Sequence, residues 1–547
     1  MEKDLQTKIN VNSNIYCSDL EQIKEDRTNF KLSLRKKKCY DILAKKRIYP
    51  PIPSKIFRPY EFNFSKLNLP SYYKIIFAKE EELIKTALES MKSDDIITVT
   101  YGVCLLKSYL SNFLDNVSIL KNLNLTFVSD ILNMLEKYCE KKELRIVYNL
   151  LYILTNYSYV NDNKLITNIL LSSKGYRVWE LCFDMQDYEI MSQMIWILHN
   201  ITYKNGEGSY NLIKSNFFRN KIFSFYSNEI IMRHMNEKNS DDIFYIIIDN
   251  GICLLANLIL LQFPSSYDQK DKYNLCFPLF DLLLKYSMSN SEKIYNCCIY
   301  AISLAIDENL DLLQGYDDNN NVNIINLLNS ILSKKFFSNE KLVINSNRIL
   351  GNFISMKSDL SEEFYIKCIQ YEFDIVFGIK SELAIKESYW VLSNILHDYQ
   401  KAAFIICNNI PFLDKTMTMY QNLVKINDIK EMIYFIRSLV SRCNIEDFIK
   451  LQDRGVVDIT MKFSKEKLNN ANSLITLLEL IDTFLFIGES VKDNFKGKNL
   501  IKEKCDNYGL KELLEEYENT DNEKLYDIID KINRDYYSND ENNENMF

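Results

Sequence analysis

The scarcity of helix-breaking residues constrains the fold of this chain more than any other feature. Only 8 prolines and 12 glycines occur among 547 residues, and after Ser71 the only prolines are Pro264, Pro278 and Pro411. Because proline removes a backbone donor and clashes inside a helix, its absence leaves long stretches able to stay helical. Hydrophobic residues make up 47% of the chain, and a chain of this length exceeds the size of one compact core. The sequence therefore predicts an all-α protein built as several domains or as one array of repeats.

One helical element recurs: an aromatic residue followed four positions later by asparagine, inside an apolar stripe. The clear copies are Tyr152 with Asn156, Trp196 with Asn200, and Trp390 with Asn394, and degenerate copies are Cys253 with Asn257, Tyr300 with Leu304, Arg348 with Asn352, and Tyr434 with Ser438. The intervals between successive fourth-position residues are 44, 57, 47, 48, 42 and 44. Armadillo and HEAT repeats are about 40 to 47 residues long. The one long interval is explained by a charged stretch at 234–242, which we expect to be an inserted loop.

The recurrence matters more than any single pair. Packing and capping are sufficient to explain a single aromatic and asparagine pair. They do not explain why the asparagine recurs in mid-helix, where it competes with the backbone for hydrogen bonds and is unfavourable. Residues four apart share one helix face, so stacked repeats place these pairs in register. We therefore expect a right-handed superhelical solenoid of armadillo repeats over residues 70–500, with the pairs along a concave groove.

The first 69 residues differ from this body in charge and in proline content. Residues 24–47 contain ten basic and three acidic side chains, a local charge of +7, which leaves −15 for the remainder because the whole chain carries −8. We expect a basic helix there, followed by a flexible, proline-bearing linker. Such an arm binds an acidic partner or folds back onto its own acidic body. A nucleic-acid-binding patch is the third interpretation.

Composition argues against several classes of function. No apolar run reaches the roughly 18 to 20 residues that cross a bilayer, and 13 cysteines without a C-x-x-C pair favour reduced, buried thiols. Only three histidines occur, His199, His234 and His397, with no zinc-ligand spacing and no glycine-rich phosphate loop. We expect neither enzyme activity nor a cofactor, and no contact with a membrane. Direct nucleic-acid binding by the body is disfavoured by its negative charge.

Three segments of the body resemble the importin-α family of nuclear import adaptors. They are Trp390-Val-Leu-Ser-Asn394-Ile, Arg348-Ile-Leu-Gly-Asn352 and Trp196-Ile-Leu-His-Asn200-Ile. The resemblance implies a groove in which asparagine amides bind the backbone of an extended basic localisation signal while tryptophan rings pack on lysine and arginine stems. The later-groove residues it implies are Arg348, Asn352, Glu387, Trp390, Asn394, Glu431 and Tyr434. The early-groove residues are Tyr152, Asn156, Trp196, Asn200 and Asn257, and this site departs from the family because Tyr152 and Cys253 replace tryptophan and Lys204 replaces an acidic residue.

The two ends of the chain extend the resemblance. Residues 34–38 and 43–47 are similar to the importin-β-binding segment of the family. The residues it implies for importin-β binding and for self-competition in the groove are Arg27, Leu34, Arg35, Lys36, Lys38, Lys45, Lys46 and Arg47. Residues 501–535 resemble the last, capping helices, and 536–547 the acidic tail, which implies an export receptor as a further partner. The chain is then expected to shuttle between cytoplasm and nucleus. The alternative is an armadillo scaffold without a role in transport.

Overall fold

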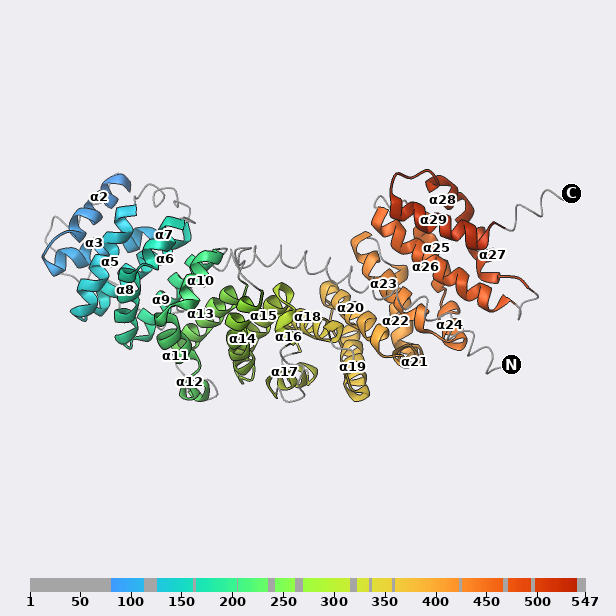
Figure 1. Ribbon diagram of the computed structural model, residues 1–547, viewed down its shortest axis with the longest axis horizontal. Helices are drawn as coiled ribbons and strands as arrows, with labels where there is room; N and C mark the ends of the chain where they lie inside the picture. Colours follow the sequence, from blue (N-terminus) through green and yellow to red (C-terminus); the bar gives the residue numbers. More distant parts are fainter. Residues whose placement is uncertain are drawn as a thin grey trace. The chain divides into compact units, whose positions relative to one another are not determined.

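The computed structural model describes residues 80–112, 125–160, 164–203, 205–234, 242–260, 269–314, 322–333, 337–356, 360–422, 426–465, 471–492 and 497–538. The expected arm at 1–69, Lys204, most of the expected insertion at 234–242 and most of the tail at 536–547 lie outside these ranges. Within them every regular element is a helix (Figure 1), which confirms the all-α prediction. None of these helices is long and apolar enough to cross a membrane.

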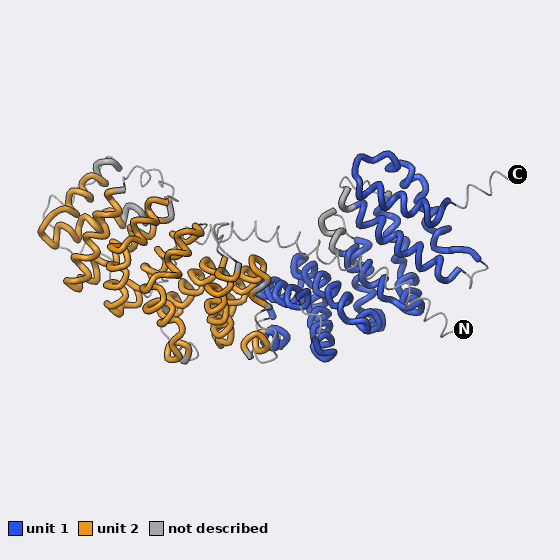
Figure 2. The backbone as a smooth tube through the Cα atoms, viewed as in Figure 1, with its two compact units in different colours: residues 1–30, 328–547 blue, residues 31–327 orange. Residues whose placement is uncertain are grey.

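The described residues fall into two compact units, separated between residues 327 and 328 (Figure 2). The N-terminal unit contains α2 (Glu80–Met91), α3 (Ile96–Asn112), α5 (Leu125–Glu140), α6 (Leu144–Val160), α7 (Lys164–Leu170), α8 (Ser173–Asp184), α9 (Tyr188–Thr202), α10 (Gly206–Lys214), the π-helix η3 (Phe218–Phe223), α11 (Ser224–Tyr226), α12 (Glu229–His234), α13 (Asp242–Ile259), α14 (Gln269–Tyr286), α15 (Glu292–Glu308) and α16 (Asp311–Gln314). Helix α17 (Val322–Leu332) contains the division between the units.

The C-terminal unit continues the same pattern of helices. It contains α18 (Glu340–Met356), α19 (Glu362–Gly378), α20 (Glu382–Asp398), α21 (Ala402–Asn408), α22 (Ile410–Gln421), α23 (Ile426–Arg442), α24 (Ile445–Gln452), α25 (Val456–Lys465), α26 (Ala471–Ser490), α27 (Leu500–Asn507), α28 (Leu510–Tyr517) and α29 (Glu523–Tyr536).

Long helices stack on one another within each unit and form its core. In the N-terminal unit α3, α6, α9, α13 and α15 pack in this order, and in the C-terminal unit α18, α20, α23 and α26 do the same. We call these two series the N-terminal and C-terminal ladder rows. Other helices cover them, as α8 and α10 cover α9. A row helix is therefore enclosed on most sides, and every residue of α9 from Glu189 to Thr202 is buried.

The covering helices reveal the type of repeat. A short helix, a second helix and a row helix follow one another as α7, α8, α9, again as α21, α22, α23, and again as α24, α25, α26. Three helices per unit of about 40 residues is the armadillo arrangement, whereas HEAT units have two. The described chain is therefore an all-α solenoid of armadillo type, a choice between armadillo and HEAT repeats that the asparagine spacing alone does not make.

Local sequence explains where these helices begin. Asp187 precedes α9 and its carboxylate accepts hydrogen bonds from the backbone amides of Glu189 and Ile190, which the first turn of a helix otherwise leaves unpaired. Ser381 caps α20 in the same way through the amide of Ala384. Pro411 lies in the first turn of α22, where its missing N–H is not needed.

The last three helices lie on the end of the C-terminal row. Helices α27 and α29 pack against α26, and α28 packs against α29. Their buried side chains include Leu510, Leu514, Leu525, Ile529 and Ile532. Gly509 precedes α28 with φ of 85°, a conformation that glycine adopts without strain.

Candidate functional site

The recurring asparagines join each row helix to the one before it. The Nδ2 atom of Asn200 on α9 donates to the carbonyl of Thr155 on α6 at 3.1 Å, and Asn257 on α13 donates to the carbonyl of His199 at 3.0 Å. In the C-terminal row, Asn394 on α20 donates to the carbonyl of Gly351 on α18 at 3.0 Å. None of these three asparagines is more than 5% exposed. The repeated residue thus makes a repeated bond between helices.

This finding supplies the reason for asparagine that the sequence left open. We expected the amides on a groove surface, where they would bind the backbone of a peptide. The structure instead buries these three side chains and directs their amide nitrogens to neighbouring backbone carbonyls. A spacing of four fixes the helix face on which a side chain lies, but it does not distinguish a surface residue from one that faces the adjacent helix. Peptide binding by these residues stays a prediction.

Asn156 differs from this pattern. It is half-buried on α6, and its Nδ2 donates to the carbonyl of Tyr152 in its own helix at 2.8 Å. Asn352 on α18 is completely buried, like the three asparagines above. Leu304 takes the asparagine position on α15 and packs in an apolar cluster with Tyr203 and Leu260.

The two ladder tryptophans lie in close contact with the row. Trp390 on α20 is fully buried against α18, where a Cβ atom added to Gly351 would lie 2.1 Å from the indole ring. Trp196 is 4% exposed, and its ring centroid lies 5.3 Å from that of His199. The indoles are therefore packing groups between repeats.

Charged pairs cross between neighbouring helices of the C-terminal row. Arg348 Nε lies 3.2 Å from Glu387 Oε1, with side-chain exposures of 15% and 6%, so the structure brings together two residues of the predicted later groove.

Two further residues of the predicted later groove lie on α23. Tyr434 is half-buried and accepts a hydrogen bond from Thr476 on α26 at 3.4 Å. Glu431 lies on α23, but its side chain is not among those described.

Sequence reasoning missed a second pair of the same kind. Arg437 on α23 contacts Glu479 on α26, with 2.6 Å between Nη1 and Oε2. Arg442, at the end of α23, donates to the carbonyl of His397 at 2.9 Å. The signal for the pair was present, because Arg437 and Glu479 are 42 residues apart, within the range of the repeat intervals.

Two buried carboxyl groups have strongly shifted pKa values. Glu372 on α19 accepts a hydrogen bond from Asn347 on α18 at 3.1 Å and is fully buried. Burial raises its pKa well above the ordinary value, against the lowering effect of its bonds with Ser388 and Asn347. Glu189, in the first turn of α9, has its pKa raised to about 7, first by burial and then by Asp187, while Lys107 lowers it. Neither group was singled out from the sequence.

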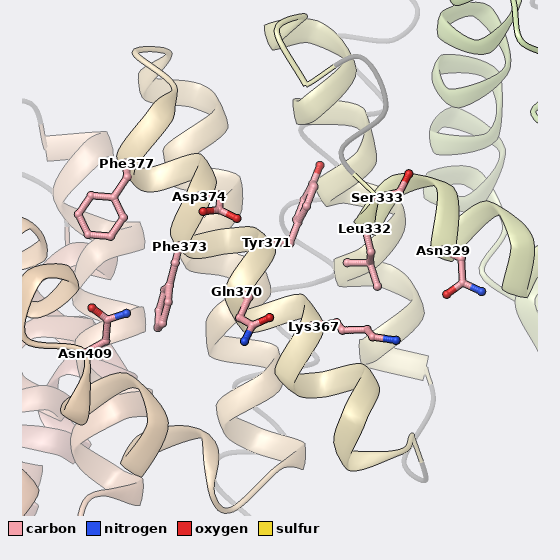
Figure 3. Close-up of a pocket in the computed structure, with 10 residues that line it drawn as sticks. All are labelled: Asn329, Leu332, Ser333, Lys367, Gln370, Tyr371, Phe373, Asp374, Phe377 and Asn409. Atoms are coloured by element: carbon pink, nitrogen blue, oxygen red, sulfur yellow. The ribbon is translucent and has the colours of Figure 1, made fainter.

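A hollow of about 640 Å³ lies among the covering helices of the C-terminal unit (Figure 3). Phe377 and Asn409 lie at one end of it and Asn329 at the other. The lining residues are Asn329, Leu332, Ser333, Lys367, Gln370, Tyr371, Phe373, Asp374, Phe377 and Asn409. It is separate from the ladder positions, and its lining mixes polar and apolar groups.

Among the described residues, no three His, Cys, Asp or Glu side chains are placed to hold a metal ion. The described cysteines are free thiols, and all of them except Cys297 and Cys443 are buried. They behave as small apolar residues of the stack.

Comparison with known proteins supports the fold. No protein-family model matches the chain, and no curated protein matches its sequence. Among solved structures, an engineered protein superimposes with a TM-score of 0.59 at 12% identity, covering 82% of this chain and 97% of that one. A chain from a study of the interaction between cadherin and β-catenin matches with a TM-score of 0.45 at 11% identity, over 74% of this chain and 83% of that one. At such identities the likeness concerns the fold alone.

Proposed function

We propose that this chain is a nuclear import adaptor that binds extended basic peptides on its C-terminal ladder row. Its basic arm links the cargo to importin-β, and an export receptor returns the adaptor to the cytoplasm, so that it works in both compartments. The role is one of binding, without catalysis. An armadillo-type solenoid is suited to this role because stacked repeats display one long, regular surface.

The observation that carries the proposal is the arrangement of Arg348, Glu387, Trp390 and Asn394. Arg348, Trp390 and Asn394 come from two segments that resemble importin-α, and Glu387 precedes the second of them. All four residues lie on the adjacent helices α18 and α20. The Glu387 carboxylate is paired with a guanidinium of the chain itself. A lysine or arginine of a ligand can compete for that carboxylate, since it offers the same charge-assisted hydrogen bonds.

A peptide titration tests this site. A fluorescent peptide rich in lysine and arginine is titrated with the full chain, with Glu387→Gln and with Asp414→Asn. Asp414 is the matched control because it is also the acid of an ion pair, with Arg454 at 2.7 Å, but lies on the covering helix α22. We expect Glu387→Gln to weaken binding about 5- to 20-fold, the loss of one charged contact. Equal effects of the two substitutions would mean that only net charge matters and would contradict the proposed site.

Binding of importin-β is tested separately. We expect purified importin-β to retain the full chain and to lose it when Arg35 and Lys38 are both replaced by alanine. The double substitution Lys141→Ala/Lys142→Ala removes the same charge from the loop after α5 and serves as the control. If importin-β retains the Arg35 and Lys38 double variant as well as the full chain, the arm is not the importin-β-binding segment.

A second function, an armadillo scaffold without transport, is favoured by one specific observation. The amides of Asn200, Asn257 and Asn394 already donate to backbone carbonyls of the row, which is sufficient to explain their recurrence. Absence of importin-β binding, together with intact binding of another protein, would decide for the scaffold.

A further inference from the structure

A lysine of the chain occupies an aromatic site at the beginning of the N-terminal ladder row. Lys107 projects from α3, and its ammonium lies 5.3 Å from the centre of the Tyr148 ring and 5.2 Å from that of the Tyr152 ring. The two tyrosines are four residues apart on α6, so both rings are on one face of that helix. All three side chains are half-buried. An ammonium within about 6 Å of a ring centre is attracted by the negative face of the ring.

A glutamate on the next row helix interacts electrostatically with Lys107. Glu189 in the first turn of α9 is 9% exposed, and its Oε1 atom has no hydrogen-bond partner among the described residues. Lys107 is near enough to lower the pKa of this carboxyl, against the raising effects of burial and Asp187. Because α3, α6 and α9 pack in sequence, three consecutive helices contribute to one place.

Two aromatic rings and a carboxylate are what a primary ammonium group requires. The rings pack on the alkyl stem and attract the charge, while the carboxylate supplies the counter-charge. In this structure the chain itself provides the cation. A second cation brought by a ligand would meet like charge at close range, and such repulsion is a common means of excluding a partner.

We propose that Tyr148, Tyr152 and Glu189 form a cation site on the N-terminal ladder row, and that the chain fills it with Lys107 and thereby excludes the lysine side chains of basic peptides. The identity of the excluded ligand rests on the proposed function, whereas the existence of the site does not. Tyr152, which replaces the tryptophan of the family, then keeps the role of an aromatic ring that contacts a cation. Lys107 becomes the residue that decides which row binds a basic peptide.

The test replaces the ammonium and leaves the stem. Lys107→Met removes the charge and keeps an unbranched side chain, and Lys107→Arg is the matched control that keeps a cation. The full-length variants are titrated with the same fluorescent lysine-rich peptide at low salt. We expect Lys107→Met to bind about tenfold more tightly than wild type, and Lys107→Arg to bind like wild type. Equal affinities of Lys107→Met and wild type overturn the proposal.

Two further variants establish that the gain is local. In Lys107→Met/Tyr152→Leu and Lys107→Met/Glu189→Gln we expect the gain in peptide affinity to disappear. The first double variant lacks one aromatic ring of the site, and the second lacks the carboxylate. A gain that survives both changes reflects net charge alone and also overturns the proposal. Thermal melting confirms that each variant is folded, and Lys107→Gln replaces Lys107→Met if the latter is not.

The test of the Lys107 site is independent of the test of the proposed function. Loss of binding on Glu387→Gln tests the C-terminal row in a chain that retains Lys107. The gain on Lys107→Met tests the N-terminal row in a chain that retains Glu387. Either result can fail while the other holds.

Discussion

At the scale of single residues, Asn200 and Asn394 occupy positions where an amide costs helix stability but joins two helices. Each donates to a carbonyl of the preceding row helix while almost fully buried. A buried hydrogen bond of this kind contributes about 1 kcal/mol net, and leaving a buried partner unpaired costs more. The asparagines therefore recur in the sequence because each repeat needs a hydrogen bond to the preceding row helix.

Replacing Asn394 by alanine should lower the free energy of unfolding by about 1 to 2 kcal/mol. Asn156→Ala is the matched control, because Asn156 is half-buried and donates within its own helix, and its cost should be well under 1 kcal/mol. Urea denaturation followed by circular dichroism measures both. If Asn156→Ala costs as much as Asn394→Ala, the bond between helices has no special role.

Glu372 should make stability depend on pH. Because burial raises its pKa in the folded chain, the folded state holds a proton that the unfolded state releases above the ordinary pKa of about 4.3. Stability is then greatest below that value and falls as pH rises toward the folded pKa, by at most about 1.4 kcal/mol per pH unit for one proton. Glu372→Gln cannot ionise, so its denaturation midpoint should fall less than that of wild type between pH 5 and pH 8. Parallel curves for the two proteins would show that Glu372 does not bind this proton.

Some of these residues could be predicted from the sequence and others could not. The asparagines were found because they recur at a fixed interval. Glu372 was not, because a lone glutamate on an amphipathic helix is usually solvated, and only its packing between Asn347 and Ser388 sets it apart. Burial of Trp390 and Asn394 was likewise hidden, since a helix face does not reveal what covers it.

At the scale of helices, α18 and α20 approach so closely because one of them carries glycine at the crossing. Gly351 faces the Trp390 ring, and a Cβ atom there would lie 2.1 Å from it. Real carbon atoms do not approach to that distance, so any larger residue must displace the indole. The Arg-x-x-Gly-Asn segment therefore carries a packing requirement within its motif.

Gly351→Ala should destabilise the chain although alanine is the better helix former. The gain in helix propensity is about 1 kcal/mol, whereas overpacking of a closed core costs about 1 to 3 kcal/mol. Gly378 at the end of α19 is the control, since the nearest atom to its added Cβ is 3.7 Å away. We expect a lowered melting temperature for Gly351→Ala and an unchanged or slightly raised one for Gly378→Ala. The reverse order would show that α18 and α20 do not pack as described.

Most row helices were predictable from the sequence, but not all. The aromatic and asparagine pairs located α6, α9, α13, α15, α18, α20 and α23. Helices α3 and α26 were not located because neither carries such a pair, although α3 packs on α6 and α26 packs on α23 and holds Glu479 against Arg437. The sequence could not distinguish row helices from covering helices by apolar pattern alone, since both kinds bury long stretches of residues.

At the scale of the whole molecule, the charge is divided between a basic segment and an acidic remainder. Residues 24–47 carry +7 in a chain whose total is −8, so the two parts attract each other. A basic segment in the same chain competes with any basic ligand at a high effective concentration.

Removal of residues 1–51 should therefore tighten the binding of a basic peptide, by about tenfold or more at low salt. The comparison requires the same fluorescent peptide with the full and shortened chains. A control in which Lys36, Lys37, Lys45 and Lys46 are replaced by alanine in the full chain should give a similar gain. Unchanged affinity in both proteins would rule out self-competition.

The central claim is that the C-terminal ladder row receives an extended basic peptide, and hydrogen–deuterium exchange of the full chain with and without such a peptide tests it most directly. The account predicts slower exchange in α18, α20 and α23 on addition of the peptide, with little change in the covering helices α19 and α22, and loss of this protection in Glu387→Gln. Protection confined to the covering helices, or no protection under conditions where the peptide binds, would contradict it.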